Sequence, residues 1–225
     1  MSKATTPPNV AQPNGPLTLY RFALSGHSHR VELMLSLLEL PFTAIDVDLR
    51  GGEQKRPAFL QMNAFGQVPV LNDNGTIVAD SNAILVYLAS RYDTEGRYLP
   101  RDAVGAAAVQ RWLSVAAGTI AYGPAAARRA NLFGGKLDEA AQTAAHNLFK
   151  VMDTHLGSRR FLCGDTVTIA DLACYSYVAH APEGGIALTP YPHVAAWLQR
   201  IEALPRFVPM PRSAVGLAAP AACVS

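Results

Sequence analysis

Residues 63–84, NAFGQVPVLNDNGTIVADSNAI, carry the pattern that decides the fold. Two short apolar runs, Val68–Leu71 and Thr76–Ala79, flank the turn-forming sequence Asn72–Gly75. Paired runs of this kind predict two antiparallel strands joined as a hairpin. Ser81 follows the second run, and apolar residues recur after it at helical spacing. The sequence therefore predicts a helix that leaves the hairpin directly.

The chain before this hairpin alternates between strand and helix patterns. Leu17–Phe22 and Phe42–Val47 are typical of strands, and a helix pattern between them follows the polar stretch 25–29 and ends before Pro41. Pro57–Met62 predicts a second, shorter helix with its proline in the first turn. A right-handed crossover makes the first two strands parallel, and the hairpin then adds an antiparallel edge. The expected order is β-α-β-α-β-β-α.

After Pro100 the pattern becomes entirely helical. Thr168 and Asp171 have the spacing of a capping box. In this motif the side chain of each residue accepts a hydrogen bond from the backbone N–H of the other. Helices are expected over residues 103–121, over residues 137–155, from Thr168 onward and after Pro192. We therefore predict an α/β domain at residues 17–96 and an all-α domain at residues 100–211. Residues 1–16 and 212–225 have the composition of a flexible leader and a flexible tail.

Composition and charge exclude several classes of protein. The formal net charge is +2, from 19 Lys and Arg against 17 Asp and Glu, so no basic surface for a nucleic acid is expected. The three cysteines, Cys163, Cys174 and Cys223, have neither disulfide-framework nor metal-ligand spacing. No apolar run approaches the roughly 18 residues that cross a bilayer. We expect a cytoplasmic protein with no metal, no membrane span and no nucleic-acid partner.

Three motifs occur in the order found in the cytosolic glutathione S-transferases, and the chain resembles that family. Residues 19–20 followed by 25–31 are similar to its first strand, active-site loop and helix start. Residues 63–71 are similar to its N-P-x-G-x-V-P-x-L motif, and residues 79–84 to its E-S-x-A-I motif. The resemblance implies a thioredoxin-like α/β domain followed by an all-α helical bundle. It is nearest to bacterial members with a serine-type active site.

The resemblance also implies a function. Glutathione, bound as a thiolate, would attack an apolar electrophile in a detoxification reaction, and the enzyme would be a homodimer. Alternatives on the same scaffold are a glutathione-dependent isomerase, a disulfide or peroxide reductase, and a non-catalytic binding protein. Two positions depart from the family pattern, because Ala64 replaces its usual Pro and Asp80 its usual Glu.

The resemblance implies a set of glutathione contacts. Pro69 matches the family's cis-proline, which turns the Val68 N–H and C=O toward the cysteinyl backbone of the ligand. Ser81 and Gln67 would hold the γ-glutamyl carboxylate, and Asp80 would attract the α-ammonium. Lys55, and after it Arg50, is a candidate for the glycyl carboxylate. From its position alone, Ser81 is equally explained as an ordinary helix N-cap.

The thiolate needs a stabilising hydrogen-bond donor, because a free thiol has a pKa near roughly 8.5. Ser25 is the first candidate, since it lies where serine-type members carry this hydroxyl and a helix begins there. Ser28, His27 and Tyr20 follow in that order. His27 and His29 are otherwise expected in a loop, exposed to solvent. Four aromatic residues are candidates to line an electrophile pocket or, taken singly, to pack in the core: Trp112, Tyr122, Phe133 and Tyr175.

Overall fold

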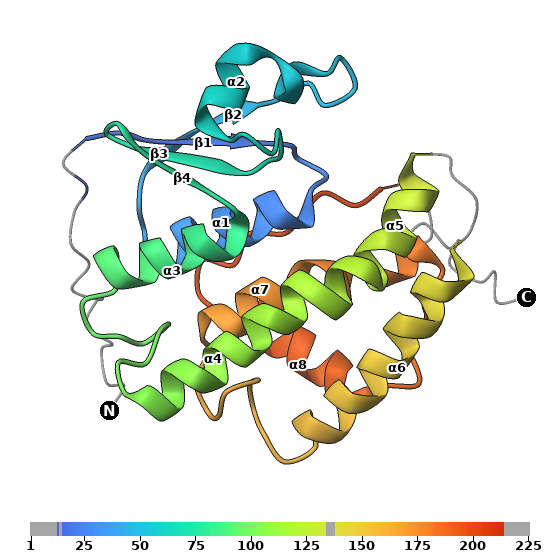
Figure 1. Ribbon diagram of the computed structural model, residues 1–225. Helices are drawn as coiled ribbons and strands as arrows, with labels where there is room; N and C mark the ends of the chain where they lie inside the picture. The colour runs from blue at the N-terminus through green and yellow to red at the C-terminus, as the bar shows by residue number, and fades with distance from the viewer. Residues whose placement is uncertain (1–12, 14, 134–137, 214–225) are drawn as a thin grey trace, which may run out of the picture.

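The computed structural model describes residue 13, residues 15–133 and residues 138–213. Most of the predicted leader and tail falls outside these ranges. The described chain forms two layers, a small α/β domain and a bundle of helices below it (Figure 1). This architecture confirms the predicted thioredoxin-like domain followed by an all-α domain.

Four short strands form the sheet of the first domain, in the spatial order β2-β1-β3-β4. β1 pairs with β2 in parallel and with β3 antiparallel, and β3 pairs antiparallel with β4. The hairpin of β3 and β4 therefore lies beside β1, at one edge of the sheet, as the sequence predicts. The strands are β1 (Leu17–Arg21), β2 (Phe42–Asp46), β3 (Val70–Asp73) and β4 (Thr76–Ala79).

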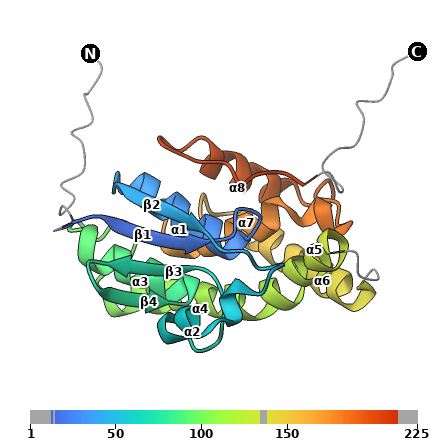
Figure 2. The same cartoon turned by 90° about the horizontal axis from the view of Figure 1, so that it is seen from above.

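Helices cover both faces of this sheet (Figures 1 and 2). Helices α1 and α3 separate the sheet from the helical bundle, and α2 lies on the opposite face. Side chains of a strand alternate between its faces, so Leu17 and Leu19 are both fully buried in the larger core. The helices are α1 (Gly26–Leu37), the 3₁₀ turn η1 (Glu53–Lys55), α2 (Pro57–Met62) and α3 (Ser81–Tyr92).

All the secondary-structure elements assigned to the described residues of the second domain are helices, joined by loops. Helix α7 is its centre, because it packs against α1 of the first domain and against α4 of its own domain. Every α7 residue from Ile169 to Val178 is buried, as expected of a helix surrounded by others. The elements are α4 (Ala103–Val115), η2 (Ala116–Ile120), α5 (Pro124–Leu132), α6 (Glu139–Leu156), α7 (Ile169–Ala179), η3 (Ala181–Gly184) and α8 (Pro192–Glu202).

Two features of the bundle differ from the sequence prediction. The helix expected over residues 103–121 is α-helical only to Val115 and continues as a π-helical turn, η2. Helix α5 was not predicted at all, although Pro124 stands in its first turn, a position that favours proline. Its alanine-rich sequence has too few large apolar residues for a clear periodic signal.

One hydrophobic core runs through both domains, from Leu17 in β1 to Ile201 in α8. The chain after α8 adds polar contacts between the domains, since the Ser36 hydroxyl of α1 donates to the Arg206 carbonyl at 2.7 Å. No helix within the described ranges is both long and apolar enough to cross a membrane.

Candidate functional site

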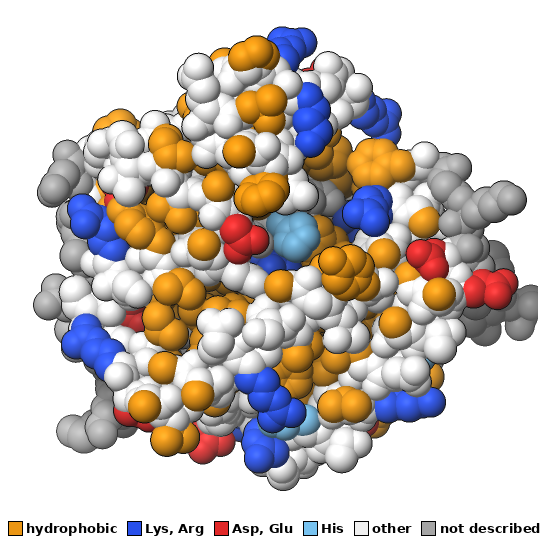
Figure 3. All heavy atoms as spheres, viewed as in Figure 1, with side chains coloured by type: hydrophobic (Ala, Val, Ile, Leu, Met, Phe, Trp, Pro, Cys, Tyr) orange, Lys and Arg blue, Asp and Glu red, His pale blue; other side chains and the backbone are white. Residues whose placement is uncertain are grey.

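A cavity of about 830 Å³ lies between the two domains. Figure 3 shows hydrophobic side chains gathered around acidic, histidine and basic side chains on this face of the molecule. The α/β domain lines one side with residues from the loop before α1, the loop before β3 and the start of α3. The helical domain lines the other with residues 117–133 and Tyr177. Five predicted site residues lie in this lining: Ser25, Gln67, Val68, Asp80 and Ser81.

The loop before β3 lines the cavity. The Val68–Pro69 peptide bond is cis, as predicted. Val68 lines the cavity and precedes the strand ladder, which begins at Val70. Asn63 shapes the loop, because its side-chain amide donates to the Gln67 carbonyl at 2.8 Å and its oxygen accepts from the Phe65 N–H at 3.1 Å. Val68 is thus held at the cavity wall, and its backbone has no β-ladder partner among the described residues.

Asp80, and not Ser81, is the N-cap of α3. Its Oδ1 accepts from the N–H groups of Asn82 at 2.9 Å and Ala83 at 3.0 Å. Asp80 has a φ of 74°, which brings it into the left-handed region. Ser81 is the first helical residue, is almost fully buried and lines the cavity. The expectation that Ser81 caps the helix was wrong, because the carboxylate one residue earlier satisfies those N–H groups.

Ser25 is the N-cap of α1 and lines the cavity. Its Oγ accepts from the Ser28 N–H at 3.3 Å, which leaves the hydroxyl hydrogen free to donate elsewhere. The N-terminus of α1 also carries the positive end of the helix dipole. Ser25 therefore offers a donor beside a favourable electrostatic potential.

Two of the alternative donors do not line the cavity. Ser28 is fully buried, and its Oγ accepts from the Phe22 N–H at 3.2 Å. Tyr20 packs its ring edge-on against Phe59 on the α2 side of the sheet. Neither is among the residues that surround the cavity.

His27 and His29 both belong to α1, so the expectation of two exposed loop histidines was wrong. His29 is 2% exposed, and its ring bonds the Ser176 hydroxyl and the Val208 carbonyl, each at 2.8 Å. His27 lines the cavity, with Nδ1 3.2 Å from the Ser81 hydroxyl. The register of α1 turns one histidine into the core and the other into the cavity.

The two residues predicted to hold the glycyl carboxylate, Lys55 and Arg50, do not line the cavity. Lys55 is exposed, and its ammonium donates to the Phe65 carbonyl at 3.1 Å. It therefore holds the loop whose residues Phe65 and Gly66 line the cavity, without lining the cavity itself. Arg50 is exposed in the turn before η1 and is also outside the lining.

Comparison with known proteins decides the family. The family model described as "Glutathione S-transferase, N-terminal domain" matches residues 24–91, and "Glutathione S-transferase, C-terminal domain" matches residues 112–205. "Glutathione S-transferase 3" of Zea mays is 36% identical over 206 residues, which cover 85% of this chain and 91% of that protein. The chain belongs to the glutathione S-transferase family.

Solved structures agree with this assignment. A glutathione S-transferase from Pseudomonas fluorescens [Pf-5] is 34% identical, with a TM-score of 0.82 over 87% of this chain and 99% of that one. A glutathione transferase homologue from Drosophila mojavensis, solved with bound glutathione, is 28% identical, with a TM-score of 0.78 over 84% of this chain and 89% of that one.

In this transferase a buried arginine that sequence analysis missed lies behind Ser81. Arg30 is fully buried and donates to the Ser81 hydroxyl at 3.3 Å and to the Asn82 side-chain oxygen at 2.8 Å. It has no carboxylate partner among the described residues, and its Nε and Nη2 have no hydrogen-bond acceptor there. Burial lowers the pKa of the Arg30 guanidinium, although a guanidinium stays charged in proteins. The sequence did offer a signal for this residue, because Arg30 interrupts the apolar pattern of α1.

Arg30 and Ser81 together determine which ring nitrogen of His27 carries the hydrogen. Since the guanidinium donates to the Ser81 oxygen, the Ser81 hydroxyl can donate to His27 Nδ1, and the ring then carries its own hydrogen on Nε2. Burial, with the positive charges of Arg30 and Arg129, lowers the pKa of His27 to about 3. His27 is therefore a neutral donor in the cavity wall near neutral pH.

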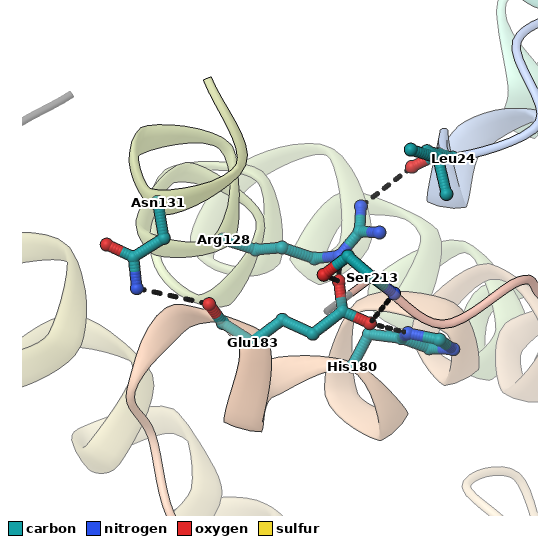
Figure 4. Close-up of polar contacts among 6 residues, drawn as sticks. All are labelled: Leu24, Arg128, Asn131, His180, Glu183 and Ser213. Atoms are coloured by element: carbon teal, nitrogen blue, oxygen red, sulfur yellow. Dashed lines mark hydrogen bonds and ion pairs between the residues drawn. The ribbon is translucent and has the colours of Figure 1, made fainter. Parts of the chain in front are cut away.

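The transferase also has a second missed arginine, on α5. Arg128 Nε donates to Glu183 at 2.6 Å, and its Nη1 donates to the Leu24 carbonyl at 2.7 Å (Figure 4). Glu183 in turn accepts from His180 at 2.6 Å and from the Ser213 hydroxyl at 2.6 Å. Arg128 thereby connects the helical domain to the residue that precedes Ser25.

The aromatic candidates divide between core and cavity. Trp112 and Tyr175 are buried in the core. Tyr122 and Phe133 line the cavity from the helical side and are exposed. The sequence alone did not separate the two pairs, because the direction in which each ring points depends on how the helices pack.

Proposed function

We propose that this enzyme joins the glutathione thiolate to an electrophilic carbon of an apolar substrate bound between the two domains. The observation that carries the proposal is the shared lining of one cavity by Ser25, by Val68 and by Ser81 at the start of α3. Those groups match the three needs of the ligand, namely an ionised sulfur, a paired peptide backbone and a held carboxylate.

Glutathione would lie along the α/β side of the cavity. Its cysteinyl backbone would pair with the N–H and C=O of Val68, which precede the strand ladder. The γ-glutamyl carboxylate would meet the Ser81 N–H at the first turn of α3, with Gln67 alongside. The buried charge of Arg30 supports an anion at that point, because it forms no ion pair with a described carboxylate and Asp80 is the one such carboxylate whose charge acts on it.

The remaining charges of the ligand would be held at two further positions. Asp80 uses Oδ1 to cap α3, and its Oδ2 has no hydrogen bond within the described part of the chain. That oxygen would accept from the α-ammonium group. We assign the glycyl carboxylate to Lys55, which would have to exchange its present contact with the Phe65 carbonyl for the ligand.

Ser25 would stabilise the thiolate by donating its hydroxyl hydrogen to the sulfur, at the positive end of α1. A hydrogen bond to the charged form lowers a pKa, and each unit corresponds to about 1.4 kcal/mol. The thiol proton leaves to solvent, the sulfur forms a bond to carbon, and the leaving group departs with its electron pair. We assign the enzyme a cytoplasmic role in detoxification and expect a homodimer, which its molar mass in solution tests.

The test of this proposal is turnover with glutathione and a generic aryl halide in the wild type and in Ser25→Ala. We expect kcat to fall by roughly tenfold to a hundredfold, since hydrogen bonds to charged groups contribute about 1.5–3 kcal/mol. The absorbance of the bound thiolate should titrate at a pKa about one to two units higher in the variant.

Two further variants separate chemistry from folding. Ser25→Thr keeps both the hydroxyl and the helix cap, so it should retain most of the activity. Ser90→Ala removes an exposed hydroxyl elsewhere on α3 and should leave turnover unchanged. Unaltered kcat and thiol pKa in Ser25→Ala would remove Ser25 from this role.

A further inference from the structure

Exposed aromatic side chains gather at the cavity. Phe65 is 80% exposed, Tyr122 77% and Phe133 50%, and all three line the cavity. Tyr122 and Phe133 stand just before and just after α5, on the helical side. Exposed apolar side chains that cluster at a concave surface mark a binding site. Because aromatic rings pack well on one another, this side suits a planar aromatic group.

The described charges on the helical side of the cavity are positive, and one of them has no ion-pair partner among the described residues. The charged residues of the described lining are Asp80, Arg128 and Arg129. Asp80 belongs to the opposite side and caps α3, and Arg128 is paired with Glu183. Arg129 is exposed and forms no ion pair or hydrogen bond with any described residue. The helical side of the cavity therefore carries a cation that has no counter-charge among the described residues.

The field of Arg129 reaches across the cavity. Its charge is among the causes that lower the pKa of His27, after burial and together with Arg30. His27 lies on the opposite side, in α1. A group bound between His27 and Arg129 would therefore experience a positive potential, which favours an anion.

We propose that the electrophile is an aromatic compound that carries an anionic group, such as a carboxylate, and that Arg129 pairs with this group. This inference rests on the proposed transferase function and names its substrate class. Tyr122 and Phe133 would contact the ring, and Arg129 would hold the carboxylate at the helical side. With a benzylic chloride the thiolate forms the C–S bond, the C–Cl bond breaks, and chloride leaves with the electron pair.

A matched pair of substrates tests the pairing. We would measure kcat/KM at saturating glutathione for para-(chloromethyl)benzoate and for its methyl ester, each corrected for the uncatalysed rate. The two compounds share the ring and leaving group and differ in the negative charge. We expect the wild type to prefer the carboxylate by about tenfold, which corresponds to about 1.4 kcal/mol.

Variants of Arg129 test whether this residue causes the preference for the carboxylate over the ester. Arg129→Gln should lower the carboxylate-to-ester ratio by about tenfold, and Arg129→Lys should keep part of it because the charge remains. Arg160→Gln removes another exposed arginine of the helical domain, outside the cavity lining, and should leave the ratio as in the wild type. A ratio near one in the wild type, or an equal loss with both substrates in Arg129→Gln, would overturn the proposal.

A binding measurement separates this inference from the transferase function itself. Calorimetry would compare the benzyl conjugate of glutathione with the para-carboxybenzyl conjugate. Tighter binding of the carboxylated conjugate, lost in Arg129→Gln, supports the inference even if neither chloride is turned over. Failure of both conjugates and of glutathione to bind contradicts the transferase function, whereas equal binding of the two conjugates contradicts only the role of Arg129.

Discussion

Single side chains around the cavity are held in one protonation state by their surroundings. His29 accepts the Ser176 hydroxyl hydrogen on Nδ1 and donates from Nε2 to the Val208 carbonyl, so both ring nitrogens are satisfied in the neutral form. Burial lowers the pKa of His29 to about 4. The neutral form of His27 is likewise favoured, by burial and by two nearby arginines. Both histidines therefore connect folding stability to pH.

The direction of that dependence follows from proton binding. In the unfolded chain a histidine takes up a proton below a pKa of about 6.5, whereas folded His29 stays neutral down to about 4. The unfolded state thus binds more protons between these values, and stability falls as the pH falls through that range. We expect the free energy of unfolding to drop by about 1 kcal/mol for each such histidine between about pH 7.5 and about pH 5.5.

Urea unfolding at the two pH values measures this fall. His27→Gln or His29→Gln should each reduce the difference between the two pH values, whatever its effect on stability at either one. His193→Gln replaces an exposed histidine and serves as the control. The same pH difference in all four proteins would contradict the assignment.

At the scale of an element, α7 depends on one carboxylate. Thr168 is its N-cap, and the predicted capping box with Asp171 is present. Asp171 is fully buried and also accepts from the Leu162 N–H at 2.8 Å and from the Trp197 ring at 2.9 Å. The sequence predicts the local half of this arrangement, because a capping box lies within four residues. It could not predict Leu162 and Trp197, which reach Asp171 only after the bundle has formed.

Asp171→Ala should therefore cost more than the loss of a helix cap. The substitution leaves buried N–H groups of Thr168, Leu162 and Trp197 without an acceptor, and each such group costs about 1–3 kcal/mol. We expect the free energy of unfolding to fall by at least about 3 kcal/mol in urea denaturation. Asp165→Ala, at an exposed position, should change it by less than about 0.5 kcal/mol. If Asp171→Ala lowered the free energy of unfolding by only about 1 kcal/mol, the effect would be that of losing a helix cap, and the prediction would be contradicted.

At the scale of the whole molecule, the pair of Arg128 and Glu183 connects the bundle to the loop before α1 (Figure 4). The two side chains are 3% and 1% exposed. Burial opposes the charge on Glu183, but hydrogen bonds from Ser213, His180 and Arg128 hold the pKa of its carboxyl below the usual value. The three donors come from different segments, so the contact exists only in the assembled fold.

Breaking this pair should weaken the assembled fold. In Glu183→Gln the Arg128 cation remains buried without its counter-charge, so we expect a loss of about 3–5 kcal/mol in thermal or urea unfolding. The double variant Arg128→Met with Glu183→Leu removes both charges and should recover part of that loss. Glu139→Gln, at an exposed position in the first turn of α6, is the control. Equal stability of Glu183→Gln and the wild type would contradict a structural role for the pair.

The cis bond before Pro69 was implied by the resemblance to the family. The amino-acid sequence alone predicts the element order of the α/β domain, the hairpin and the capping box of α7. These features depend on residues close together in the chain, where turn chemistry, proline and periodicity act locally. Only the packing of the elements places His29 in the core and His27 at the cavity, and brings Arg128 and Arg129 of α5 to the cavity wall. Those positions depend on how helices from distant segments pack, and packing selects a face of each helix that local sequence leaves open.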